Sequence, residues 1–404
     1  MTDTADTAVR ARVIESDAEA IEVATDYAHD VAAGAAERDR ERSIPYEELA
    51  ALGRSGLLGI TVPRAYGGAE VSAATVGEVF RIISAADPAI GQIPQNHITF
   101  VNVLRLDGSA EQKRFFFGQI LGGARFGNAL SERGTKHVYD LQTRLRRDPA
   151  GGYRLSGRKY YCTGALTAQW IPVYAIDDEK RIVVAYVERD APGVEVTDDW
   201  TAMGQRATIS GTTTFEDVAV PDEHVVAHWR RFEVPQLFGS FGQLMHAAVD
   251  VGIAENALAD AAEFVRTRSR PWFESGLDRA ADEPHIVLRF GQLATRVHAA
   301  QELLRKAGRV LDDAEKEQPV SEQAAADASL AVAEAKAFAG DVALEVANEL
   351  FALAGTSATD EKYNLDRHWR NARTHTLHDP NRWKYVHVGN YLVNGTLPPN
   401  HGVL

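Results

Sequence analysis

Two histidines and an aspartate lie close together near the end of the chain, in the stretch RNARTHTLHDPNRW at residues 370–383. His375 and His378 are three residues apart, so on a helix their side chains share one face. With Asp379 they could supply the two imidazoles and one carboxylate of an iron site. Alternatively, Asp379 could act as a catalytic carboxylate, or the imidazoles could donate protons near neutral pH without adding a permanent charge. Nothing else in the chain supports a metal site, so we expect no bound metal.

The elements that must position these residues begin with a helical segment that extends to about residue 125. Its pattern is interrupted at VPRAYGGAE (62–70), which we expect to be a loop because Pro63 and the Gly67-Gly68 pair forbid regular structure. A helix is predicted over residues 72–87 and ends at Asp87-Pro88.

From about residue 126 to 235 the sequence is rich in strand-forming residues. RIVVAYVERD and TTTFEDVAVP predict strands, and the Gly-Gly and Ser-Gly pairs of GGYRLSGRKYYCTGA signal turns. Helices then return, and the Ala-rich stretch closed by Gly355 predicts one long helix packed in a bundle. We therefore predict an α+β fold with an N-terminal helical domain (1–125), a middle β-barrel or sandwich (126–235) and a C-terminal helical bundle (236–404).

The composition is that of a soluble globular protein of two or three domains, with 404 residues, 45% of them hydrophobic and 25% charged. A net charge of −14 argues against a nucleic-acid partner. The single cysteine, Cys162, excludes an intrachain disulfide and a cysteine-based zinc cluster. The start of the sequence has no basic and apolar secretory leader, and no apolar run is long enough to span a bilayer. We expect a cytoplasmic protein that does not enter a membrane.

Three motifs together resemble the acyl-CoA dehydrogenase superfamily. GLLGITVPRAYGGAE is similar to the entry motif of that family, MGQRATISGTTTFEDVAVP (203–221) is similar to the signature that closes its middle domain, and RNAR (370–373) resembles the RDAR of its last long helix. The motifs span most of the chain in the right order. The resemblance implies the acyl-CoA dehydrogenase-like fold, but a fold alone does not fix the chemistry.

Two departures separate this chain from the dehydrogenases of the family. A frequent catalytic glutamate stands nine residues after the motif arginine, and here that position is Asp379, next to Pro380. The flavin-strand motif has become SERGTKH (131–137), without its proline and its Gly-Ser-Asp end. The departures resemble a different branch, the reduced-FMN-dependent monooxygenases related to dibenzothiophene monooxygenase and the SfnB-type sulfone-metabolism proteins. That branch uses the fold to hold a C4a-hydroperoxyflavin.

The resemblance to this branch implies a set of catalytic residues. They are a histidine of the first domain, an asparagine on the flavin strand, a hydroxyl residue of the β-domain and a histidine pair near the end. In this chain they correspond to His97 in PQNHITF, Asn128 in RFGNALSE, Thr163 in YYCTGA, and His375 with His378. His97 follows an expected turn at Pro94, and a lone histidine before an apolar segment is more often a satisfied core residue.

The resemblance also implies the flavin contacts. Asn128 and Thr163 are expected near the ring, Ser131 at its edge and Tyr161 against its face. The phosphate needs cations or backbone donors. For the rest of the cofactor we expect contacts from RTRSRPW and the shortened turn after Gly355, commonly across a subunit interface: Arg268, Arg270, Trp272, Thr356 and Ser357.

These expectations combine into a two-component monooxygenase. A separate NAD(P)H-dependent flavin reductase would supply reduced FMN, and one atom of O2 would pass to a small apolar substrate, organosulfur or aromatic. The resemblance implies a homotetramer, with the tail GNYLVNGTLPPNHGVL reaching a neighbour. Two alternatives stay open, an FAD-dependent acyl-CoA dehydrogenase that uses Asp379 and a non-catalytic scaffold of the same fold.

Overall fold

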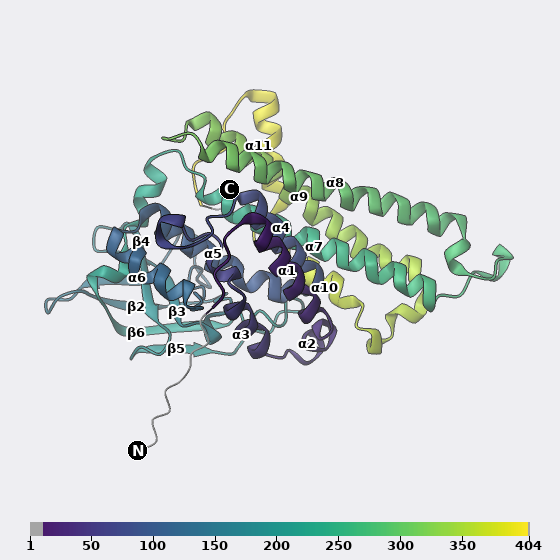
Figure 1. Cartoon of the computed structure of the whole chain (residues 1–404), viewed down its shortest axis with the longest axis horizontal. Helices are drawn as coiled ribbons and strands as arrows, with labels where there is room; N and C mark the ends of the chain where they lie inside the picture. Colours follow the sequence, from purple (N-terminus) through teal and green to yellow (C-terminus); the bar gives the residue numbers. More distant parts are fainter. Residues whose placement is uncertain (1–10, 403–404) are drawn as a thin grey trace, which may run out of the picture.

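The computed structural model describes residues 11–402 and shows a β-sheet beside a long helical bundle, with the N-terminal helices packed between them (Figure 1). Two short stretches lie outside the described part, residues 1–10 and residues 403–404. The first is half of the stretch in which the sequence predicts no secretory leader, and the second is the end of the expected tail. No helix within residues 11–402 is long and apolar enough to cross a membrane.

Six helices form the N-terminal part. They are α1 (Asp17–Ala32), α2 (Ala35–Glu41), α3 (Tyr46–Ser55), α4 (Ala73–Ala86), α5 (Pro88–Asp107) and α6 (Ala110–Leu121). Asp87 ends α4 and also caps α5, because its side chain accepts hydrogen bonds from the amides of Ala89 and Ile90. The expected turn at Pro94 is wrong, since α5 continues through this residue. Pro94 removes one donor to the helix ladder without ending it.

The middle part is one seven-stranded sheet with the order β5-β6-β2-β1-β3-β4-β7. The strands are β1 (Arg144–Arg147), β2 (Tyr153–Lys159), β3 (Trp170–Ile176), β4 (Ile182–Glu188), β5 (Val194–Thr197), β6 (Thr212–Val220) and β7 (Val225–Val226). The pairs are antiparallel except β1 with β3. The turn expected at Ser156-Gly157 is wrong, because β2 passes through it with a register shift against β6.

The C-terminal part contains α7 (Phe238–Thr267), α8 (Pro284–Glu315), α9 (Glu322–Ala354), α10 (Asp366–His375) and α11 (Asn381–Asn394). The long Ala-rich helix is confirmed as α9, which Ser321 caps and Gly355 ends with a φ of 81°. The last segment differs from the expectation, because the helix ends at His375 and residues 376–380 form a turn before α11. His378 therefore lies in this turn and not on a helical face shared with His375.

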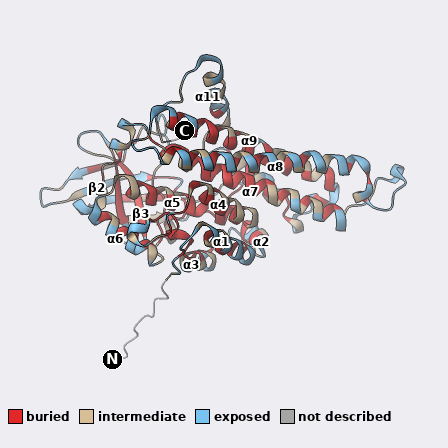
Figure 2. Cartoon of the chain, turned by 45° about the horizontal axis from the view of Figure 1, so that its top comes forward, coloured by how far each residue is buried: buried red, intermediate tan, exposed pale blue. Residues whose placement is uncertain are grey.

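The N-terminal helices and the bundle share one hydrophobic core. Buried side chains of α1, α4, α7, α8 and α9 belong to a single cluster, and Figure 2 shows these helices buried where they meet and exposed on the outside of α8. Two smaller clusters lie on the sheet. The shared core fixes α5, α7 and α10 relative to each other, and these three helices carry much of the site described next.

Candidate active site

A pocket of about 760 Å³ opens where the N-terminal helices, the sheet and the bundle meet. Its size is within the range of small-molecule and cofactor sites. Five residues predicted for the site line it: Asn128, Ser131, Tyr161, Thr163 and His378. His375 lies directly behind His378. The pocket also takes residues that the sequence did not single out, among them Gln92, Trp200, Gln205, Ser210 and His246.

Two amide side chains in the pocket wall have buried polar atoms left to pair. Nδ2 of Asn128 donates to the carbonyl oxygen of Tyr161 at 3.0 Å, but its Oδ1 has no hydrogen-bond partner among the described residues. Both polar side-chain atoms of Gln205 are also buried without a hydrogen-bond partner among the described residues. Buried polar atoms are rarely left unpaired. A flavin ring, whose edge carries both donors and acceptors, fits this pair of amides.

Thr163 begins a row of three hydroxyl groups in the pocket wall. Its Oγ1 lies 2.8 Å from Oγ of Ser210, which in turn lies 2.8 Å from Oγ1 of Thr208. Thr208 donates to the carbonyl oxygen of Gln205 at 2.9 Å. Because the single hydroxyl proton of Thr208 is donated to that carbonyl, Ser210 donates to Thr208, and Thr163 in turn donates to Ser210. The lone pairs of Thr163 Oγ1 can therefore accept a hydrogen bond from a bound molecule.

An aromatic wall stands beside this row. Tyr161 is 49% exposed and packs edge-to-face on Tyr160 and Trp200, with ring centroids 4.6 and 6.0 Å away. Its backbone has a φ of 59°, which is uncommon for a residue other than glycine. This conformation leaves the Tyr161 ring open to the pocket, where a planar ligand could stack.

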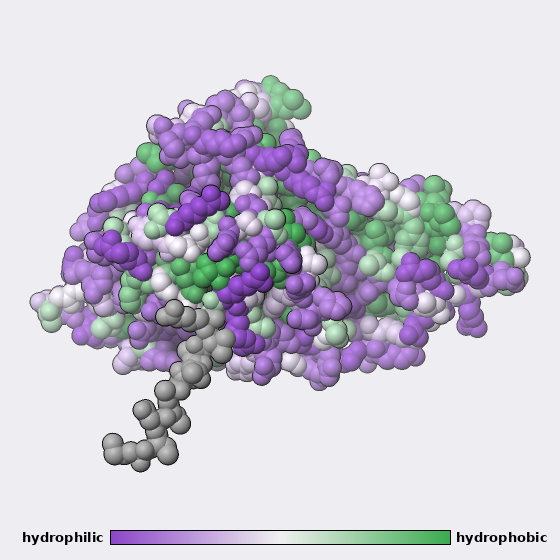
Figure 3. Space-filling view, viewed as in Figure 1, coloured by the Kyte–Doolittle hydropathy of each residue, from purple (hydrophilic) through white to green (hydrophobic). Residues whose placement is uncertain are grey.

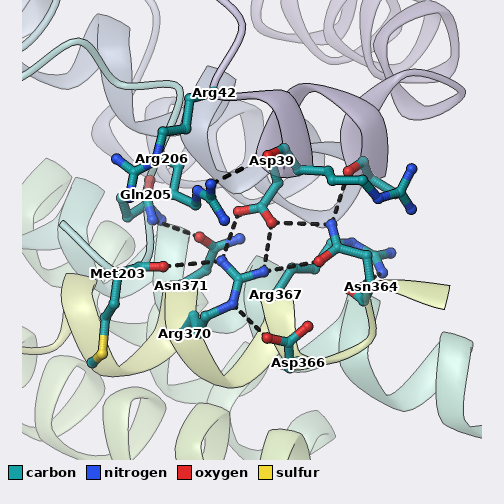
Figure 4. Close-up of polar contacts among 12 residues, drawn as sticks. Asp39, Arg42, Met203, Gln205, Arg206, Asn364, Asp366, Arg367, Arg370 and Asn371 are labelled. Carbon is teal, nitrogen blue, oxygen red and sulfur yellow. Dashed lines mark hydrogen bonds and ion pairs between the residues drawn. The ribbon is translucent and has the colours of Figure 1, made fainter. Parts of the chain in front are cut away.

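The loop between β5 and β6, which supplies Trp200 and Gln205, is clamped to α10 (Figure 4). Arg370 donates to the carbonyl oxygen of Met203 at 3.0 Å, and Oδ1 of Asn371 accepts from the amide of Gln205 at 2.6 Å. Nη1, which donates to Met203, and Nη2 of Arg370 also donate to the two carboxylate oxygens of Asp39. The RNAR motif thus positions a wall of the pocket without entering it.

Three histidines converge at the bundle side of the pocket. Nδ1 of His378 donates to the carbonyl oxygen of His375 at 2.8 Å, and its Nε2 lies 3.3 Å from Nε2 of Gln92. His375 is buried, with Nδ1 at 2.6 Å from Oδ1 of Asp250 and Nε2 at 3.2 Å from Nδ1 of His246. The bond to a carbonyl fixes the tautomer of His378, so its Nε2 accepts from the amide of Gln92.

The histidines that line the pocket are held neutral. Burial lowers the pKa of His378 to about 4, with His375 and Lys336 acting in the same direction. His378 is open to the pocket, but protein surrounds it at longer range. Burial, followed by the charge of Lys336, also lowers the pKa of His246 well below its usual value. Near neutral pH both rings offer a lone pair or an N–H without a net charge.

Asp379 has a different environment from the histidines. Its Oδ2 accepts from Nε2 of Gln243 at 2.8 Å and lies 3.2 Å from Nζ of the buried Lys336. Burial opposes its ionisation, but Lys336, Lys384 and the bond from Gln243 outweigh burial and lower the pKa of Asp379 to about 2. A carboxylate held so firmly as an anion is a weak base. Asp379 is also not the third member of the histidine group, which is His246.

His97 does not reach the pocket. It is fully buried, and its Nε2 donates to the carbonyl oxygen of Leu58 at 2.8 Å, while Nδ1 accepts from the amide of Phe126 at 2.9 Å. Burial lowers the pKa of His97 to about 3. The structure therefore corrects the expected catalytic position of His97, because both ring nitrogens bind backbone groups in the core.

The residues expected at the flavin phosphate lie far from the pocket within one chain. Arg268 follows the end of α7, roughly 30 Å along the helix from His246 at 1.5 Å per residue. Ser269 donates to the carbonyl oxygen of Ala354, which places the turn after α9 beside this end. The exposed residues gathered there are Arg268, Arg270, Trp272, Thr356 and Ser357. They could contact a cofactor only in the pocket of another copy of the chain.

The end of the tail lies against its own chain. Nδ2 of Asn400 donates to the carbonyl oxygen of Val234 at 2.8 Å, and the amide of Gly402 donates to the hydroxyl of Tyr139 at 3.1 Å. Gly402 and Tyr139 both line the pocket. The end of the tail thus covers part of the pocket of its own subunit, and a contact between the rest of the tail and a neighbour stays a prediction.

Known proteins are similar to this chain over most of its length. Residues 15–124, 128–218 and 244–383 match the models of the acyl-CoA dehydrogenase N-terminal, middle and C-terminal domains. The dibenzothiophene monooxygenase of Rhodococcus erythropolis is 34% identical over 397 residues, which cover 95% of each chain. The probable FMNH2-dependent monooxygenase SfnC of Pseudomonas putida is 31% identical, over 94% of this chain and 96% of that one.

Solved structures show the same relationship. The FMN-bound TdsC of Paenibacillus sp. A11-2 superposes with a TM-score of 0.91 at 30% identity, over 95% of this chain and all of the other. The methanesulfinate monooxygenase MsuC of Pseudomonas fluorescens superposes with a TM-score of 0.88 at 29% identity, over 95% of this chain and 99% of that one. The chain therefore belongs to the acyl-CoA dehydrogenase family, among relatives named as monooxygenases.

Proposed function

We propose that the protein is a monooxygenase that uses reduced FMN and O2 to oxygenate a small apolar substrate. The observation that carries this proposal is the similarity to the FMN-bound TdsC over 95% of this chain. The pocket supports it, because Oδ1 of Asn128 and both polar side-chain atoms of Gln205 have no partner among the described residues and the ring of Tyr161 is exposed. When bound, reduced FMN supplies the electrons that activate O2 for transfer of one oxygen atom.

The residues of the pocket divide the remaining tasks. Asn128 and Gln205 would pair with the edge of the flavin ring, and Tyr161 would cover its face. Thr163 would offer its hydroxyl oxygen to the ring as an acceptor, and Ser131 would lie at its rim. His378 would present the lone pair of Nε2 close to the reacting atoms, because its ring is neutral and the carbonyl of His375 holds its proton on Nδ1. The loop at Trp200 and the tail would help to exclude bulk water.

The substrate class follows from the relatives and from the pocket wall. Relatives are named for dibenzothiophene and methanesulfinate, and TdsC has also been solved with FMN and indole. Aromatic side chains of this chain, among them Tyr139, Tyr160, Tyr174 and Phe238, line the same pocket. We infer an organosulfur or aromatic substrate. SfnC is named as FMNH2-dependent, and we infer that a separate NAD(P)H-dependent reductase would supply the reduced FMN to this protein.

A homotetramer would complete the cofactor site. α11 exposes Trp383, Tyr385, Val386, Leu392 and Val393, the last two at 82% and 78%. Figure 3 shows hydrophobic surface on this protruding part of the molecule and along the bundle. Exposed apolar surface of this kind marks an interface. The same association would bring Arg268 and Arg270 of one subunit to the pocket of another, and light scattering should report four times the mass of the chain.

Rapid mixing tests the proposed function. The protein is mixed anaerobically with reduced FMN and then with oxygenated buffer, while absorbance is followed with and without a thioether or an aromatic compound. We expect a species that is neither reduced nor oxidised FMN, that outlives free flavin in buffer, and that disappears as an oxygenated product forms. Oxidation of FMN at the rate seen in buffer would contradict the proposal. Turnover of an acyl-CoA with an electron acceptor would favour the FAD dehydrogenase, and failure to bind flavin would favour the scaffold.

A further inference from the structure

α7 carries two polar residues, His246 and Asp250, inside an otherwise apolar stretch. They stand four residues apart in LMHAAVDVGI, so their side chains share one face of the helix. Asp250 is fully buried and His246 is 8% exposed, at the pocket. Burying a carboxylate is costly unless it is paired. The face they share is turned toward His375, which is the partner of both.

The hydrogen bonds of this group fix where each proton lies. Asp250 accepts from Nδ1 of His375 at 2.6 Å, so Nε2 of a neutral His375 carries a lone pair. Nδ1 of His246, 3.2 Å from that lone pair, must therefore donate to it. Nε2 of His246 is then an acceptor, and no described residue is hydrogen-bonded to it. The result is a directed row from a buried carboxylate to the pocket.

We propose that Asp250, His375 and His246 form a proton relay, in which Nε2 of His246 accepts a proton from the molecule bound in the pocket. The proton on Nδ1 of His246 then moves to Nε2 of His375, and the resulting imidazolium of His375 faces the carboxylate of Asp250. The reverse movement returns the proton to the pocket. Only protons move, and no bond between heavy atoms changes. The inference rests on the proposed function. It adds His246, beside His378, as a second histidine whose ring can accept a proton in the pocket.

The charges around the relay decide where the positive charge rests. Lys336 on α9, Lys384 on α11 and His378 in the turn after α10 all disfavour a charge on His246. Asp379, the nearest acid on that side, is already engaged by Lys336. Asp250 is in contact with His375 and not with His246, and its Oδ2 has no partner among the described residues. The charge is therefore more stable on His375, which gives the relay its direction.

Replacement of Asp250 by asparagine tests the relay, because Asp250→Asn keeps the shape of the side chain and removes its charge. The chain offers a matched control in Asp260→Asn. Asp260 lies on the same helix and pairs with His368 of α10 at 2.8 Å, but neither residue lines the pocket. A second variant, His246→Phe, removes the end of the relay at the pocket while keeping an aromatic ring there.

Two readouts are needed. In the FMN-free protein, proton NMR should show the Nδ1–H resonance of His375, assigned with His375→Gln, moving upfield in Asp250→Asn, because a hydrogen bond to a carboxylate is stronger than one to an amide. Asp260→Asn should leave this resonance unchanged. In the holoenzyme, the acid limb of the pH profile of oxygenation should move in Asp250→Asn, and Asp250→Asn should have no further effect when it is combined with His246→Phe.

The outcomes separate the relay from its alternatives. Equal behaviour of Asp250→Asn and Asp260→Asn in both readouts would overturn it, and so would an unchanged pH profile in His246→Phe. Stoichiometric binding of Zn²⁺ or Fe²⁺ to the wild type that is lost in His246→Phe would show a three-histidine metal site in its place. A wild type that does not oxygenate a substrate with FMN would contradict the proposed function alone, because the NMR measurement on the FMN-free protein still tests the relay.

Discussion

The guanidinium of Arg370 joins Asp39 near the start of the chain to the carbonyl oxygen of Met203 in the loop between β5 and β6. Asp39 and Arg370 each lie more than 150 residues away from Met203 in the sequence. The motif arginine therefore acts as a clamp (Figure 4), which orders the wall that carries Trp200 and Gln205. Its planar fork suits this task, because it binds a carboxylate and a carbonyl at once.

The first prediction concerns Arg370→Lys. Lysine keeps the charge but loses the fork, so it cannot donate to the carbonyl of Met203 and to both carboxylate oxygens of Asp39 at once. We expect a loss of about 1–3 kcal/mol in the free energy of unfolding, as for other buried groups left unpaired. We also expect weaker FMN binding, because the wall at Gln205 loosens. Urea unfolding and quenching of FMN fluorescence measure the two effects.

The control is Arg367→Lys. Arg367 lies on the same helix and is buried to a similar degree, but it pairs with Asp260 and has no bond to the loop. It should lower stability without changing FMN affinity. If both variants weakened FMN binding equally, the clamp would not be specific to Arg370.

Local features of the fold could be predicted from the sequence because they depend on neighbouring residues. Ser72 and Asp87 bound α4, Gly355 ends α9, and Pro221 ends β6, each through its own backbone chemistry. The turn predicted at Ser156-Gly157 was wrong for the same reason. The pair favours a turn locally, but pairing with β1 and β6 on both sides holds it extended.

The site could be predicted only in part, since it depends on how helices are rotated. On α5, Gln92, Gln95, Asn96 and Thr99 lie on one face and line the pocket, while His97 points away into the core. A helical projection of this segment would have shown that separation. His246 and Asp250 carry no motif, and their pairing with His375 spans more than 120 residues. The available signal was a pair of polar residues within an apolar helix.

The second prediction tests the structural role of His97 with His97→Phe. Phenylalanine leaves the amide of Phe126 and the carbonyl of Leu58 buried without a partner, so we expect a loss of about 1–3 kcal/mol for each group. FMN affinity and the rate of oxygenation should stay near those of the wild type in the folded protein. His29→Phe, at an exposed histidine of α1, should change none of these. Normal stability together with lost oxygenation would instead restore a catalytic role.

The third prediction is a loss of stability as pH falls. Burial lowers the pKa of His97 to about 3 and, with Arg367, that of His368 to about 4. Between these values and about 6.5 the unfolded chain binds protons that the folded chain does not, so the stability is fully present above 6.5 and is lost on acidification. Each histidine contributes up to about 1.4 kcal/mol per pH unit in that window. Urea unfolding at pH 7, 6 and 5 should show the fall, with a shallower slope in His97→Phe.

The fourth prediction tests whether one subunit completes the cofactor site of another, with Arg268→Gln and Arg270→Gln combined. Within residues 11–402, the guanidinium of Arg268 has one contact, stacking on Tyr363 with 4.9 Å between its carbon and the ring centroid, so the double variant should fold normally. A hydrogen bond to a charged group contributes about 1.5–3 kcal/mol, so FMN should bind about 10- to 100-fold more weakly. Arg266→Gln, two residues before Arg268 and in an exposed pair with Glu263, is the control.

The double variant must keep the wild-type mass in light scattering, because weak FMN binding in a dissociated protein would report the loss of the assembly and not of a phosphate contact. Wild-type affinity in an intact assembly would place the phosphate elsewhere, with Arg133 in the lining of the same pocket as the next residue to replace.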